Sequence, residues 1–266
     1  MTPIRLYTFE CGRTIIPLRN HILGAGLAGE MIATPVTWFL LTHPRGNVII
    51  DGGNAAEVAV DARTHWGRIL DMSSVEMEPE DAVTVALERM GFDLSEIRWI
   101  VQSHLHIDHT GAVADIGSFP NAQVLVSRTE YDFAMAPEGY FAMGYCQADY
   151  VKPGVDWVFL EDDEDGYDVF GDGVLRCWRT PGHSPGHLSF EVHLPSGQAL
   201  MLACDAANTV QHLEERVVSG FMLDAVETRR SIQRLRRLAW RANATVICGH
   251  DPDQWPTITR APEFYD

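Results

Sequence analysis

The sequence has no apolar run close to the roughly 18 residues that would indicate a membrane-spanning helix. Its first 20 residues include Glu10, Arg13, Pro17 and Arg19, so they contain no apolar core of the kind found in a secretory signal peptide. It also has no linker rich in Ser, Gly or Pro, no low-complexity tract and no internal repeat. We therefore expect residues 1–266 to form one soluble domain, located in the cytoplasm and not bound to a membrane.

Positive charge and paired cysteines are also scarce. Lys and Arg number 20 against 37 Asp and Glu, which gives a formal net charge of −17. This balance disfavours nucleic acid, whose phosphates are bound by Lys and Arg, and it favours a neutral small-molecule substrate over a polyanion. The five cysteines are odd in number and include no C-x-x-C pair, so we expect reduced, buried thiols.

What the sequence does have is a dense cluster of histidine and aspartate. His104, His106, Asp108 and His109 lie within six residues, directly after an apolar run. Imidazole and carboxylate are the ligands that zinc and related divalent ions prefer. If residues 100–102 form a strand, alternation sends the first two histidines the same way, and the other two residues fall in the next turn. The cluster therefore predicts a metal site, with room for a second ion.

Three more residues of ligand type follow apolar strands or a rigid turn. His183 lies in the Pro- and Gly-rich turn 180–187, Asp205 follows the apolar run 200–204, and His250 follows the run 245–248. Strands that each deliver one ligand to the same edge of a sheet are a common way of assembling a site. We expect these residues to join the histidine cluster.

Two motifs resemble binding loops but lack the necessary context. Residues 24–29 read G-x-G-x-x-G, but Pro35 leaves little room for a helix and a predicted hairpin follows. We interpret this segment as a flexible loop near the active site. Residues 161–166 resemble a calcium loop, but no helix precedes them, and we interpret them as a solvated acidic turn.

The other histidines and the arginine-rich segment are assigned structural roles. The arginines between 229 and 241 lie on a predicted helix whose apolar residues recur at three- and four-residue spacing, so we expect a solvated basic face that pairs with acids. His187 is interpreted as a hydrogen-bond partner of a metal ligand. We treat the remaining histidines as ordinary: His21, His43, His65, His193 and His212.

The predicted elements fall into two blocks of strands, each with helices following. The strands are predicted over 4–9, 36–42, 48–51, 97–102, 124–127, 157–160, 175–179, 188–193, 200–204 and 244–248. The helices are predicted over 78–90, 128–134 and 225–242. This order predicts a mixed α/β fold with two sheets packed face to face and helices outside.

Taken together, these residues resemble the dinuclear metal signature of the metallo-β-lactamase superfamily: His104-x-His106-x-Asp108-His109, His183, Asp205 and His250. Longer segments are most similar to the N-acyl-homoserine lactonases, especially the branch that also opens γ-butyrolactone. These segments are Ile50–Asn54, Val101–His106, Tyr167–Gly173, Thr180–His183, Gly249–Asp253 and Ala261–Tyr265.

The resemblance implies a four-layer αββα sandwich with two divalent metal ions at one edge, zinc first and iron, manganese or cobalt as alternatives. It implies that His104, His106 and His183 hold one ion, and that Asp108, His109 and His250 hold the other. Asp205 would bridge the two ions, and Asp51 would orient the histidine ligands. The related lactonases also suggest a homodimer.

The sequence departs from the family at one position. The lactonases usually carry a tyrosine three residues after the bridging aspartate, where its hydroxyl reaches the substrate carbonyl, and here that position is Asn208. The amide N–H of an asparagine can donate to an oxyanion, but it is shorter and cannot supply a proton. This substitution affects the choice of substrate more than the fold or the metals.

The resemblance implies hydrolysis of a neutral lactone, of the N-acyl-homoserine lactone or γ-butyrolactone type, by attack of a metal-bound hydroxide to give a hydroxy acid. We assign Asp108 as the proton carrier to the leaving alkoxide and Asn208 as a donor to the carbonyl.

Three alternatives stay open. The first is a thioester hydrolase of the glyoxalase II type, or another ester or cyclic-amide hydrolase, on the same metal site. The second is an iron-dependent enzyme like the persulfide dioxygenases, although seven ligands favour two ions over one. The third is a non-catalytic interaction module, although degenerate members normally lose ligands.

Overall fold

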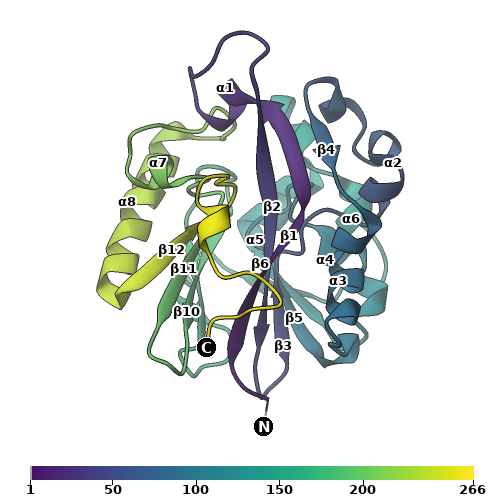
Figure 1. The fold of residues 1–266 in the computed structure, drawn as a ribbon, viewed down its shortest axis with the longest axis vertical. Helices are drawn as coiled ribbons and strands as arrows, with labels where there is room; N and C mark the ends of the chain where they lie inside the picture. The colour runs from purple at the N-terminus through teal and green to yellow at the C-terminus, as the bar shows by residue number, and fades with distance from the viewer. Residues whose placement is uncertain (1) are drawn as a thin grey trace.

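Two blocks of apolar strands form two β-sheets in the computed structural model, which describes residues 2–266. The larger sheet has the strand order β4-β1-β2-β3-β5-β6-β7, and the smaller sheet has the order β12-β11-β10-β9-β8. Figure 1 shows α8 outside the smaller sheet and α2, α3, α4 and α6 on the side of the larger sheet. The fold is therefore the αββα sandwich expected from the sequence.

The strands of the larger sheet are β1 (Arg5–Pro17), β2 (Met31–Thr42), β3 (Asn47–Ile50), β4 (Ser74–Glu76), β5 (Ile97–Val101), β6 (Gln123–Ser127) and β7 (Trp157–Leu160). Those of the smaller sheet are β8 (Tyr167–Asp168), β9 (Leu175–Arg179), β10 (Leu188–His193), β11 (Ala199–Cys204) and β12 (Ala244–Cys248). The α-helices are α1 (Leu18–His21), α2 (Glu57–Trp66), α3 (Val83–Arg89), α4 (Gly111–Ala114), α5 (Arg128–Met135), α6 (Gln147–Tyr150), α7 (Val210–Leu213) and α8 (Ala225–Ala242). Short 3₁₀ helices lie at Gly67–Asp71, Pro79–Asp81, Leu94–Glu96, Ile116–Ser118, Gly139–Gly144 and Trp255–Thr257.

The central strands β2, β3, β5, β6, β10 and β11 are largely buried on both faces, which explains their nearly continuous apolar sequences. In β2, Phe39 and Leu41 pack into the core between the two sheets, whereas Trp38 and Leu40 pack into the core on the other side. In β11, alternate residues likewise divide between the central core and the layer beneath α8. Because both sheets are enclosed in this way, the positions of the strand ends are fixed by packing.

Several elements differ from the sequence prediction. The helix predicted over 78–90 is broken, because Pro79–Asp81 forms a separate 3₁₀ turn and Ala82 is extended (φ −60°, ψ 139°) before α3 begins. The first strand is longer than predicted and pairs with β2 as far as Pro17, with a register shift between Glu10 and Arg13. Helix α2 was not predicted at all.

Several expectations from composition and charge are confirmed. All five cysteines are free thiols, and four of them are buried. On α8, Arg229 and Arg236 pair with Glu215, and Arg234 pairs with Asp165 of the acidic turn.

No helix among residues 2–266 is both long and apolar enough to cross a membrane.

Candidate metal centre

The seven residues of ligand type lie in loops at one edge of the two sheets. β3 and β5 are parallel in the larger sheet, and β11 and β12 are parallel in the smaller one, so the carboxyl ends of each pair lie together. The loop 104–109 follows β5, Asp205 follows β11, His250 follows β12, and His183 lies in the β9–β10 turn. The ligand atoms form three overlapping groups: His104, His106 and His183; Asp108, His109 and His250; and His104, His109 and Asp205.

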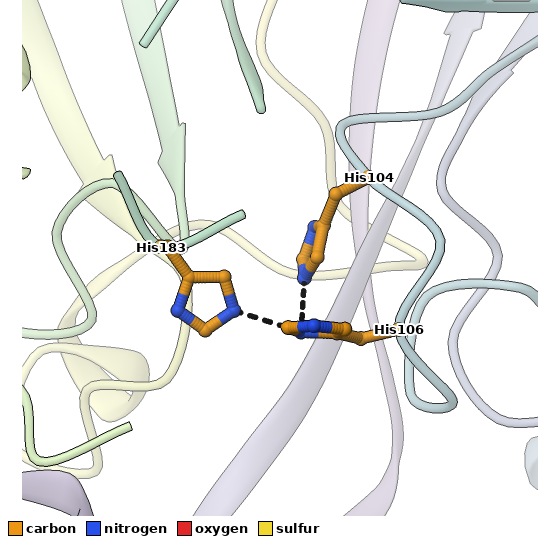
Figure 2. A group of neighbouring side chains, drawn as sticks. All are labelled: His104, His106 and His183. Atoms are coloured by element: carbon orange, nitrogen blue, oxygen red, sulfur yellow. Dashed lines mark hydrogen bonds between the residues drawn. The ribbon is translucent and has the colours of Figure 1, made fainter. Parts of the chain in front are cut away.

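The first group consists of three converging imidazoles (Figure 2). His104 Nε2 and His183 Nε2 each lie 2.9 Å from His106 Nδ1. Nitrogens around a tetrahedral zinc lie about 3.3 Å apart, since each Zn–N bond is about 2.0–2.1 Å long, so the observed spacing is close to that of a shared ion. Burial holds the pKa of His104 and of His106 well below the ordinary value, so both rings are neutral and in the form that binds metal.

The second feature is that the tautomers of three histidines are fixed. Each Nδ1 faces an oxygen that can only accept a hydrogen bond: Asp51 Oδ2 at 2.9 Å from His109, Phe221 O at 3.1 Å from His183, and Pro35 O at 2.8 Å from His250. Nδ1 therefore carries the hydrogen, and in a neutral ring Nε2 presents a lone pair. All three Nε2 atoms point to the same place.

That place is the carboxylate of Asp205. Its Oδ1 lies 3.3 Å from His109 Nε2 and 3.1 Å from His250 Nε2, and its Oδ2 lies 3.3 Å from His183 Nε2. His109 Nε2 and Asp205 Oδ1 are buried and have no hydrogen-bond partner among the described residues. Lone pairs that face one another in this way need a cation between them, and Asp205 directs one oxygen to each histidine group.

The electrostatics of the site also favour cations. Burial lowers the pKa of His109, but the carboxylates of Asp108, Asp205 and Asp51 outweigh it and leave this pKa well above the ordinary value. At His250 burial also lowers the pKa, but the nearby carboxylates, Asp205 above all, outweigh this effect and raise the pKa to about 9. The negative charge of these carboxylates favours a proton on each ring, and a divalent ion can balance that charge instead. The residues present therefore fit two such ions.

Two further residues position the ligands, and both were predicted from the sequence. Asp51 is buried at the end of β3, where it accepts hydrogen bonds from Ser103 N (2.7 Å), Ser103 Oγ (2.9 Å) and the ring of His109. It adopts a left-handed backbone conformation, with φ of 65°, that non-glycine residues rarely use outside functional sites. His187 Nε2 accepts a hydrogen bond from the backbone N–H of Asp205 at 3.1 Å.

We expect Asp51→Asn to weaken metal binding by roughly 10–100-fold, the effect typical of losing such a supporting hydrogen bond. The NH₂ group of asparagine cannot accept the hydrogen bonds that one carboxylate oxygen of Asp51 now accepts. Competition against a chromophoric chelator would measure the affinity. Asp168→Asn is a matched control, since Asp168 accepts backbone hydrogen bonds in a turn away from the site. Equal losses in the two variants would contradict the positioning role.

Glu130 is a buried carboxylate on α5 that was not predicted from the sequence. It accepts hydrogen bonds from Leu105 N (3.1 Å), Tyr145 Oη (3.0 Å), Ser184 Oγ (2.6 Å) and Gly186 N (3.0 Å). Burial raises its pKa, and all four donors oppose that shift. Glu130 thus ties the first histidine loop to the turn that carries His183. Its four partners are distant in sequence, so no local pattern could have indicated this role.

A separate, fourth group of ligand-type residues, His65, Cys146 and Asp149, needs no metal. His65 Nε2 lies 2.7 Å from Asp149 Oδ1, and Thr110 Oγ1 donates to Asp149 Oδ2 at 2.7 Å. Each oxygen of this buried carboxylate therefore already has a donor. The hydrogen bond to Asp149 raises the pKa of His65 to about 10, so the pair is ionic at neutral pH. It links α2 and α6 to the residue after His109.

This ion pair predicts a pH-dependent stability. Because the folded-state pKa of His65 lies above its ordinary value of 6.5, its contribution is fully present below about pH 6.5 and is lost as the pH rises through about 10. The difference in melting temperature between wild type and His65→Gln should therefore be largest near pH 6 and shrink towards pH 10. A difference that stays constant with pH would rule out the ionic pair.

A cavity opens in front of the seven ligand-type residues; its volume, with the open solvent at its mouth included, is about 840 Å³. Much of its wall is apolar: Ile16, Pro17, Trp66, Ile69, Met72, Met143 and Phe221. Asn208 lines this cavity and is 7% exposed; its backbone oxygen accepts a hydrogen bond from His250 N at 3.0 Å. Asp108 also lines it and is the most accessible of the ligand-type residues, with 19% of its side chain exposed.

The treatment of His21 as an ordinary histidine is wrong. It lies at the end of α1, is 1% exposed, and lines the same cavity as Asp108 and Asn208. The sequence around it carries no ligand pattern, and its position depends on backbone hydrogen bonds that join residues 20 and 23 to the segment 218–220, between α7 and α8. Its side chain belongs to the wall of the candidate site.

Comparisons with known proteins agree with this geometry. Residues 31–250 match the family model described as the metallo-beta-lactamase superfamily. The chain is 46% identical to the N-acyl homoserine lactonase AttM of Agrobacterium fabrum over 266 residues, and 29% identical to an N-acyl homoserine lactonase of Bacillus thuringiensis; the matches cover 99–100% of this chain and all of each relative. A solved N-acyl homoserine lactone hydrolase, with the product N-hexanoyl-L-homoserine bound at its catalytic metal center, superposes with a TM-score of 0.86 at 26% identity over the full length of both chains.

Proposed function

This chain belongs to the metallo-β-lactamase superfamily and, within it, to the family of N-acyl homoserine lactonases, and from that premise we propose that it opens the ring of a neutral lactone to give a hydroxy acid. One observation carries the proposal. The seven ligand-type residues converge at one end of a largely apolar cavity, with Asp205 directing one oxygen to each histidine group.

We propose that His104, His106 and His183 hold one metal ion, that Asp108, His109 and His250 hold the other, and that Asp205 is shared. Zinc suits this mixture of imidazole and carboxylate ligands. Divalent ions bound there would lower the pKa of a bound water from about 15.7 to about 7 and polarise a carbonyl oxygen.

Side chains of the protein would supply the proton for the leaving alkoxide and orient both the substrate and the candidate metal ligands. Asp108 is the ligand-type carboxylate most open to the cavity, and it is our candidate to carry a proton to the alkoxide released on ring opening. Asn208 lines the cavity, and we propose that its amide N–H donates to the lactone carbonyl. Asp51 and His187 hold His109 and Asp205 in place throughout.

The cavity and the charge balance support a neutral substrate with an apolar chain. The wall beside the ligands is formed by aliphatic and aromatic side chains, which exclude water and can pack against an acyl group. The formal charge of −17 disfavours anionic substrates and should help the anionic hydroxy acid to leave.

The test is a pH-stat panel, because ring opening releases a proton without a chromophore. Lactones with graded acyl chains and a glutathione thioester would be compared on zinc-loaded and chelated protein. We expect the lactones to release acid, and a chelator to abolish that release. Each added methylene that the cavity can bury should lower KM roughly fourfold, because burying one methylene contributes about 0.8 kcal/mol. No metal-dependent acid release from any lactone, or faster turnover of the thioester, would overturn the proposal.

A further inference from the structure

One thiol of the protein lies outside the core and beside a charged ring. Cys146 is partly exposed, whereas the other four cysteines are buried. Its Sγ lies 3.7 Å from His65 Nε2, and the thiol donates to the backbone oxygen of His65 at 3.6 Å. The same Nε2 donates to the buried carboxylate of Asp149 at 2.7 Å. Cys146 therefore belongs to a cluster of three chemically active groups that lies outside the candidate metal centre.

The geometry of this cluster excludes a catalytic triad. A base that activates a thiol must offer it a lone pair, but His65 Nε2 carries the hydrogen that Asp149 accepts. The hydrogen bond to Asp149 raises the pKa of His65 to about 10, so the ring is positive at neutral pH. A sulfur that faces a cationic N–H is typical of cysteines that react with oxidants.

Small reagents can reach this sulfur from the surface. Cys146 lines a hollow whose volume, with the open solvent at its mouth included, is about 720 Å³, enough to admit a peroxide or a small thiol. Burial raises the pKa of the other four thiols and keeps them in the unreactive protonated form: Cys11, Cys177, Cys204 and Cys248. A mild oxidant should therefore select Cys146.

The sulfur is also connected on two sides to the loop 104–109, which carries four ligand-type residues. Tyr145, the residue before it, places its ring edge-on against His106 with centroids 4.6 Å apart. On the other side, Asp149 accepts a hydrogen bond at 2.7 Å from Thr110, which directly follows the loop. An oxygen bound to the sulfur can accept the hydrogen of His65 Nε2 in place of Asp149. That exchange loosens the contact that holds the end of the loop.

Building on the proposed lactonase function, we propose that Cys146 is a site of reversible oxidation by peroxides and that its oxidation lowers lactone turnover. The thiolate sulfur attacks one oxygen of hydrogen peroxide, so an S–O bond forms as the O–O bond breaks and hydroxide leaves. The sulfur is oxidised by two electrons to a sulfenic acid, and the peroxide is reduced. A small thiol then condenses with the sulfenic acid to give a mixed disulfide and water, and a second small thiol regenerates Cys146 as the small disulfide is released.

The first experiment treats the zinc-loaded protein with hydrogen peroxide and dimedone, which traps sulfenic acids, and locates the label by mass spectrometry. We expect Cys146 to be labelled about tenfold faster than any other cysteine. His65→Gln keeps a hydrogen-bond donor but removes the charge, and it should slow the labelling of Cys146 about tenfold. Equal labelling of all five cysteines, or a rate that His65→Gln does not change, would overturn the assignment.

The second experiment follows turnover of N-hexanoyl-homoserine lactone before peroxide, after peroxide, and after glutathione is added, without dimedone. Peroxide should lower kcat of the wild type about threefold or more, within the range of coupling between neighbouring parts of a fold, and glutathione should restore it at unchanged zinc content. Oxidation of the cavity residues Met72 and Met143 would persist in glutathione, since methionine sulfoxide is reduced by dedicated enzymes.

Cys146→Ser is the matched variant, because its hydroxyl is similar in size to the thiol and is not oxidised. It should turn over the lactone before peroxide and keep that rate afterwards. An equal loss in Cys146→Ser and wild type, or no loss in wild type although Cys146 is labelled, would contradict the regulatory role. If the untreated wild type opens no lactone, the proposed function fails, whereas the labelling still decides whether Cys146 is the oxidised residue.

Discussion

Asp205→Ala should abolish stable binding of both metal ions and lower kcat/KM for a lactone by about 10³-fold or more. Metal ions lower the activation free energy of such a reaction by several kcal/mol, and about 1.4 kcal/mol corresponds to a tenfold change in rate. Losing the ions therefore gives an effect of the expected size. Asp205 is singled out because it lies within 3.3 Å of three ligand histidines and directs one oxygen to each group. No other carboxylate contacts both groups among the described residues.

Metal stoichiometry measured by mass spectrometry, together with lactone turnover, checks this prediction. Asp205→Asn is the companion variant, since it keeps one oxygen acceptor and the side-chain shape but loses the charge. We expect it to fall between wild type and Asp205→Ala in metal content. Full stoichiometry in Asp205→Ala would show that this residue is not a shared ligand.

Asp108→Asn should lower kcat by roughly 10²-fold or more while changing KM only a few-fold, because general acid catalysis of this kind contributes about 10²–10⁴-fold. Like Asp205, Asp108 lies near the ring nitrogens of at least two histidines, but its side chain is more exposed, 19% against 7%. It faces His109 Nε2 and His250 Nε2 at 3.7 Å each, and it is also open to the cavity. It can therefore meet both the metal ligands and a substrate oxygen.

A thiolactone separates the proton-carrying role from a loss of metal. A thiol has an ordinary pKa of about 8.5, far below that of an alcohol, so a leaving thiolate needs little protonation. The kcat loss in Asp108→Asn should then be much smaller for the thiolactone than for the oxygen lactone of the same shape. An equal loss for both substrates, or an effect confined to KM, would contradict the proton role.

The convergence of the seven ligand-type residues could be predicted because most of the signal is local in sequence. His104, His106, Asp108 and His109 are almost consecutive, and Asp205 and His250 directly follow apolar strands whose ends are held by two packed sheets. Helix α8 was predicted with its observed bounds, 225–242, because its apolar spacing is also a local signal; in the structure Asp224 caps its first turn. Asp51 and His187 were predicted as supporting residues and are confirmed in that geometry.

The residues that sequence reasoning missed depend on contacts between distant segments. Glu130 receives its four donors from residues 105, 145, 184 and 186, and only the fold brings these together. The position of His21 in the cavity wall depends on backbone hydrogen bonds that join residues 20 and 23 to the distant segment 218–220. The break at Ala82 arose because Pro79 begins a separate turn, which apolar periodicity alone did not indicate.

The central claim is that this protein is a two-metal lactonase, and a metal titration of the chelated protein tests it most directly. Ring opening of N-hexanoyl-homoserine lactone would be followed by proton release as zinc is added. We predict almost no turnover without metal, and a rate that rises until two zinc ions are bound per chain. Turnover that is unaffected by chelation, or that reaches its maximum at one ion per chain, would contradict the account.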